Sequence, residues 1–68
     1  MRLIPFEQSD MYGETWVTLV NPNQISSVQS EIRRFCVVLA GGPDCVVRYG
    51  DGAQEYGEQF LLRCIEPS

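Results

Sequence analysis

The 68-residue chain predicts a small α+β fold, mostly β, with an antiparallel sheet of four to five strands and a short C-terminal helix. Two β-type apolar runs flank a Gly-Gly-Pro-Asp turn and predict a central hairpin at about residues 34–49. Upstream, residues 15–20 form a further run rich in β-branched side chains. Downstream, the apolar residues between Phe60 and Ile65 recur at helical spacing and predict a helix at about residues 57–65.

The N-terminal half reads as short strands separated by polar turns. Residues 2–6 predict a strand that Pro5 confines to an edge or to the end of pairing, and the polar residues 7–14 predict a loop. Asn-Pro at positions 21–22 predicts one helical or 3₁₀ turn. A modest strand follows at residues 25–30, where the spacing of the two strongly apolar residues indicates a bulge.

Residues 53–66 are compatible with a helix or a strand. The apolar spacing and Pro67 as a stop favour a helix, whereas Gly57 disfavours one that begins early, so we place its start near Gly57. Such a helix would cover the Phe35 side of the sheet. Residues 1–68 form a single domain, and a chain this short buries only about 60% of its unfolded surface. Oligomerisation would be an obvious supplement to its stability.

The hairpin can be paired if Gly41 to Pro43 form its loop, which sets Phe35 opposite Tyr49. Because side chains alternate between faces, one face of the pair is then apolar and the other mixed. The apolar core face carries Phe35, Val37, Leu39, Cys45, Val47 and Tyr49. The mixed face carries Arg34, Cys36, Val38, Val46 and Arg48. Near-complete burial is expected for Val37, Leu39, Val47 and Phe60.

Charge and composition narrow the function classes. Nine acids face five arginines, a net charge of −4 with no lysine or histidine, which argues against a nucleic-acid partner. The longest apolar run is far too short to cross a membrane, so we expect a cytoplasmic protein. A cysteine nucleophile would lack an imidazole partner, and no phosphate-binding glycine loop is present. The sequence therefore predicts a protein that is not an enzyme.

The three cysteines are interpreted as reduced thiols that act as small buried hydrophobic side chains. The paired register places Cys36 and Cys45 on opposite faces, beyond the reach of a disulfide. Without histidine or a Cys-x-x-Cys pair, we expect no metal and no cofactor.

The arginines are the one polar feature that could bind a ligand. On the paired register Arg34 and Arg48 point to the mixed face as diagonal neighbours, and Arg33 or Arg63 could join from its rim. Guanidinium groups suit carboxylate or phosphate, so these four residues are candidate binding residues for an anionic molecule or an acidic partner surface. The alternative pairs them with local acids such as Glu31 or Asp51.

Residues 16–65 resemble a known family in layout. A Trp-Val-Thr-Leu-Val-Asn-Pro-Asn-Gln-Ile-Ser-Ser-Val run at residues 16–28, a β-run, an Asp-Gly turn at residues 51–52 and a short amphipathic end are similar to small FlbD-like proteins and to short phage-encoded proteins of the same design. The long N-terminal loop and the Gly-Gly-Pro-Asp turn depart from that pattern. The resemblance implies a small β-domain and carries no catalytic residues.

Excess apolar surface predicts self-association. The strand before the Gly-Gly turn is apolar on both faces, and one short helix covers only one of them. We therefore expect a homodimer or higher closed oligomer, with Trp16, Val38 and Val46 at or near the contact and Arg48 at its rim.

Three functions remain open at the level of sequence. The first is a non-enzymatic interaction protein, such as a phage-type modulator that binds and blocks a host protein. The second is a homo-oligomeric binder that sequesters an anionic small molecule, such as a nucleotide, through the arginines. The third is an accessory subunit of a larger assembly.

Overall fold

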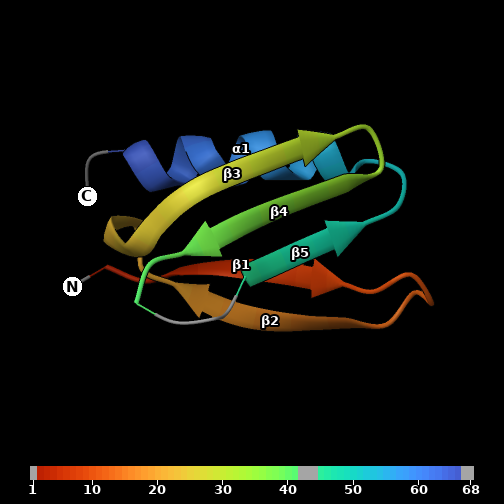
Figure 1. Cartoon of the computed structure of the whole chain (residues 1–68), viewed down its shortest axis with the longest axis horizontal. Coiled ribbons are helices and arrows are strands. Elements are labelled where there is room, and N and C mark those ends of the chain that lie inside the picture. The colour runs from red at the N-terminus through yellow and green to blue at the C-terminus, as the bar shows by residue number, and fades with distance from the viewer. Residues whose placement is uncertain (1, 42–44, 67–68) are drawn as a thin grey trace.

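The computed structural model describes residues 2–41 and 45–66 and folds them into two antiparallel sheets and one helix (Figure 1). The first sheet pairs β1 (Ile4–Ser9) with β2 (Thr15–Val20). A 3₁₀ turn, η1 (Pro22–Gln24), leads into the second sheet, whose order is β3 (Ile25–Glu31), β4 (Arg34–Leu39) and β5 (Cys45–Tyr49). The helix α1 (Ala53–Ile65) follows. The mostly-β α+β class is confirmed, but the strands form two sheets rather than one.

The turns between strands form where small polar residues predict them. The Asn21 side chain accepts a hydrogen bond from the Asn23 amide at 3.0 Å and caps η1, whose first residue is Pro22. The pairing of β3 with β4 shifts between Ile25 and Ser27, which confirms the bulge. Residues 42–44 of the predicted hairpin loop lie outside the described residues.

The first strand is longer than the sequence indicates. Residues Glu7 to Ser9, expected in a loop, continue β1 because they pair with residues 15–17 of β2. The turn that joins the two strands is closed by Asp10, whose carboxylate accepts hydrogen bonds from the amides of Tyr12 and Glu14.

The helix α1 begins at Ala53, four residues before its predicted start at Gly57. Gly57 is buried, and a Cβ atom there would lie 2.2 Å from the Phe35 ring. The glycine therefore permits close contact between α1 and β4 and does not mark the start of the helix. In Figure 1 the helix lies behind β3. It also contacts β4, and the packing of Gly57 against Phe35 places it on the Phe35 side of the sheet, as expected.

One hydrophobic core fills the space between α1 and the two sheets. Phe6 lies at its centre, with its ring 4.8 Å from the ring of Phe60 in an edge-on arrangement. Both rings are almost fully buried. The core residues are Ile4, Phe6, Val20, Phe35, Val37, Val46, Ala53 and Phe60. No helix of the described residues is long and apolar enough to span a membrane.

The β4–β5 register differs by one residue from the predicted pairing. Phe35 pairs with Arg48 and Val37 with Val46, so Val46 and Arg48 lie on the side of α1. Cys45, Val47 and Tyr49 therefore share the opposite face with Arg34, Cys36 and Val38. The prediction was wrong because both strands carry valines on both faces, which leaves their apolar pattern without a preferred register. The burial of Val37 and Phe60 is confirmed, whereas Leu39 and Val47 are only half-buried.

Candidate protein interface

The outer edge of β5 is closed by side chains of β1. The Val47 amide donates to Gln8 Oε1 at 3.2 Å, and the Tyr49 amide donates to Ser9 Oγ at 2.9 Å. Ser9 Oγ in turn donates to the Tyr49 carbonyl at 3.0 Å. Gln8 and Ser9 are both buried, and their side chains supply the hydrogen bonds that a neighbouring strand would otherwise make along this edge. This role was not predicted, because the polar residues 7–14 indicate a loop rather than a strand.

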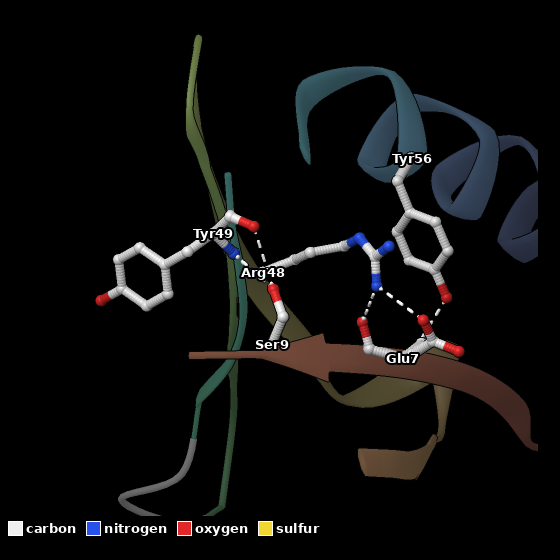
Figure 2. A network of polar contacts seen from close by, with 5 residues as sticks. All are labelled: Glu7, Ser9, Arg48, Tyr49 and Tyr56. Atoms are coloured by element: carbon white, nitrogen blue, oxygen red, sulfur yellow. Dashed lines mark hydrogen bonds and ion pairs between the residues drawn. The ribbon is translucent and has the colours of Figure 1, made fainter. Parts of the chain in front are cut away.

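Arg48 links β5, β1 and α1 (Figure 2). Its Nη1 donates to the Glu7 carbonyl at 2.9 Å and lies 3.1 Å from Glu7 Oε1. Its guanidinium lies 4.2 Å from the centre of the Tyr56 ring, and the Tyr56 hydroxyl accepts a hydrogen bond from the Glu7 amide at 2.7 Å. Arg48 and Tyr56 thus satisfy both backbone groups of Glu7. These contacts give Arg48 a structural role.

The other predicted binding arginines do not converge with Arg48. The register places Arg34 on the sheet face opposite Arg48, which corrects the expected diagonal pair. Arg34 lies 3.7 Å from Glu31, and Arg33 pairs with Asp51, so both contact the local acids considered as alternatives. Arg63 lies apart from them, in the last turn of α1.

A cleft of about 440 Å³ lies beside Arg33, between the β1–β2 turn and the end of β5. Its lining includes Tyr49, which could stack on a ring, but also the acid Asp10. Because Arg33 is already paired with Asp51, this cleft offers little net positive charge to a nucleotide. Among the described residues, no cluster of His, Cys, Asp and Glu could hold a metal ion.

The edge of β3 is polar and irregular. Every residue after Ile25 in this strand is exposed, and the side chains are mainly Ser, Gln and Glu. The bulge at its start interrupts the ladder, and Gln54 of α1 donates to Ser30 Oγ at 3.0 Å. Bulges, charges and covering elements are the devices that discourage strand pairing at a sheet edge.

Within residues 2–41 and 45–66, the edge of β2 shows no bulge and carries no charged residue. Glu7 pairs with Val17, yet both backbone groups of Glu7 bond away from β2, to Tyr56 and Arg48. Glu7 and Val17 are thus a non-hydrogen-bonded pair, and the Val17 amide and carbonyl point to the outer edge. Because hydrogen-bonded and non-hydrogen-bonded pairs alternate along the ladder, the amides and carbonyls of Thr15 and Leu19 also point to the outer edge. We find no hydrogen bond to these groups within residues 2–41 and 45–66.

Large apolar side chains flank this edge. Val17 and Leu19 are 61% and 60% exposed on the outer face of the hairpin, and Trp16 is 44% exposed on the other face. Leu3 and Leu19 also line a second cleft of about 330 Å³. We call the backbone edge of Thr15–Val20 and the side chains of Trp16, Val17 and Leu19 the β2 edge.

The predicted interface residues are divided by the fold. Trp16 belongs to the β2 edge, and Val38 is half-buried on the sheet face turned away from α1. Val46 is only 2% exposed and belongs to the core, so the expectation that it lies at a contact is wrong. The one-residue register difference is the cause, because it turns Val46 towards α1.

Comparisons with protein-family models, with curated proteins and with solved structures find no match for this chain. The resemblance to FlbD-like proteins therefore stays a prediction.

Proposed function

We propose that this protein is a non-enzymatic interaction protein that binds an extended strand of a partner protein along the β2 edge. The observation that carries the proposal is the combination of unpaired backbone groups at Thr15, Val17 and Leu19 with exposed apolar side chains beside them. Strand addition uses both features, since main-chain hydrogen bonds supply affinity and alternating side chains supply specificity.

The charges around β2 define the partner strand further. The strand itself carries no charge, whereas Glu14 immediately precedes it, Asp10 lies in the turn before it and the whole chain has a net charge of −4. A partner strand with alternating apolar residues and a lysine or arginine beside Glu14 therefore complements this edge. Occupying the edge strand of a larger protein would block its own pairing, which is how a small phage-type modulator of a host protein would act.

A direct binding test uses a labelled peptide that contains the sequence of Thr15–Val20 between two lysines. The peptide can pair antiparallel with the β2 edge, because in an antiparallel pair about Thr18 the outward groups of Val17 meet those of Leu19. We expect saturable binding in fluorescence anisotropy. Val17→Lys should weaken binding by about tenfold or more, since a charged side chain on an edge opposes pairing.

Ser27→Lys on the β3 edge is the matched control, because it adds the same charge at an exposed strand position. Equal thermal melting of both variants would show that the folds are intact. Absence of peptide binding, or equal weakening by the two variants, would contradict the proposal.

Protein purified from cells supplies the second test. Native mass spectrometry should show a co-purified polypeptide with the parent and with Ser27→Lys, and its loss with Val17→Lys. An additional small mass retained in all three samples would instead support the anionic-ligand hypothesis.

A second copy of the chain can occupy the same edge. In a two-fold antiparallel pair about Thr18, Val17 of each chain lies opposite Leu19 of the other, and no charge opposes this contact within the strand. We therefore expect a concentration-dependent homodimer in sedimentation experiments, and a monomer for Val17→Lys at the same concentration. A dimer that persists unchanged in Val17→Lys would place self-association elsewhere.

A further inference from the structure

Cys36 and Cys45 lie on the same face of the β3-β4-β5 sheet. Cys36 pairs with Val47, and Val38 pairs with Cys45, so the two cysteines are diagonal neighbours on adjacent strands. This corrects the sequence-based placement on opposite faces. Cys64 belongs to α1, which covers the other side of the sheet. All three cysteines are free thiols.

The two neighbouring thiols differ in access to solvent. Cys45 is exposed at the start of β5, whereas Cys36 is 3% exposed in the central strand. Burial first, and then the neighbouring Cys45 thiol, raise the pKa of Cys36. A reagent from solvent therefore meets Cys45 first, and the raised pKa keeps the Cys36 thiol protonated at neutral pH.

We propose that Cys36 and Cys45 form a dithiol site for a low-molecular-weight disulfide such as oxidised glutathione. The Cys45 thiolate attacks the glutathione disulfide, a new S–S bond forms, and one glutathione leaves as thiolate. Cys36 then loses its proton and attacks the Cys45 sulfur, and the second glutathione leaves. The two cysteines lose two electrons and two protons, and one oxidised glutathione becomes two reduced molecules.

The distance between the two cysteines determines how easily the disulfide between them is reduced. Diagonal cross-strand neighbours have Cα atoms about 7–8 Å apart, slightly beyond the roughly 4.4–6.8 Å that disulfides span. Closure requires the start of β5 to shift along β4, and this distortion makes the bridge easily reducible. Reduced glutathione in excess should therefore reopen it.

Tryptic mapping of the wild-type chain tests the proposal without any substitution. Arg34 and Arg48 bracket residues 35–48, so one tryptic peptide contains Cys36 and Cys45, while Cys64 falls in another. After incubation of the folded protein with oxidised glutathione, we expect this peptide to be lighter by two hydrogens and free of glutathione. A persistent glutathione adduct on the peptide, two free thiols, or a bridge between two chains would overturn the proposal.

Two variants in a Cys64→Ser background test the order of events. Cys36→Ser should hold glutathione permanently on Cys45, because the resolving thiol is missing. Cys45→Ser should be modified far more slowly than the parent, because Cys36 is buried. Equal rates for Cys45→Ser and the parent, with equal thermal melting, would contradict the role given to Cys45.

Discussion

Gly57→Ala is expected to destabilise the protein even though alanine is the better helix former. The substitution should gain about 1 kcal/mol from helix propensity. However, the added Cβ would lie 2.2 Å from Cγ and Cδ2 of Phe35, well inside the 3.4 Å at which ordinary contact begins. Phe35 is fully buried, so its ring cannot move away and the helix must lift from β4.

Overpacking of this kind costs about 1–3 kcal/mol or more. The overlap with several ring atoms indicates the upper end of that range, so we expect a net loss of about 2 kcal/mol in the free energy of unfolding. A domain of this length has only roughly 3–10 kcal/mol in total, so the loss is readily measured.

Urea unfolding followed by circular dichroism measures this loss as a lower midpoint. Gln59→Ala, at an exposed position of the same helix, is the matched control and should be neutral or slightly stabilising. Phe35→Leu should cost less in the Gly57→Ala background than in the parent, because the smaller side chain relieves the overlap. A Gly57→Ala protein as stable as the parent would refute the argument that Gly57 is required for contact with Phe35.

Three further predictions concern the register, the Arg48 network and pH. Val46→Ala should cost about 1–3 kcal/mol in urea unfolding and Val47→Ala clearly less, because only Val46 belongs to the core; the reverse order would support the alternative register. Arg48→Met should cost about 0.5–1.5 kcal/mol, since it removes the hydrogen bond to the exposed Glu7 carbonyl, whereas Arg63→Met should cost little; equal effects would argue against the network. Burial raises the pKa of Cys36 and Cys64 above the ordinary 9.0, so the folded state retains protons that the unfolded state loses. Stability should therefore fall as the pH rises above about 9, and the fall should be smaller for Cys36→Ala; an identical pH profile would contradict this.

The elements of the fold could be predicted wherever turn residues separate apolar runs. Asn21-Pro22 gave η1, and the Gly50 to Gly52 stretch separated β5 from α1. The spacing of Phe60 and the following apolar residues favoured a helix over a strand, and the structure has the helix, although it begins four residues before the predicted start at Gly57.

The relative placement of the elements could not be predicted from the same pattern. Valines on both faces of β4 and β5 make the apolar pattern fit two registers, and the observed one is marked by the burial of Val46 and by the contacts of Arg48 with Tyr56 and Glu7. Arg48 was placed on the mixed face by the predicted register, whereas the observed register turns it towards α1, where its long side chain lies against Tyr56. Gly57 was judged by helix propensity, while its role depends on Phe35, which is 22 positions away in the sequence.

The candidate interface follows from a comparison of strands within one chain. β3 carries a bulge and Glu31, and β5 has its edge groups bonded to Gln8 and Ser9. The edges of β3 and β5 are therefore protected, whereas β2 presents six uncharged residues in a regular strand. Exposed strand edges are thus not tolerated throughout this fold, and β2 is the exception. An edge that binds a partner strand has to be regular and uncharged, because a bulge or a lysine in β2 would prevent strand addition.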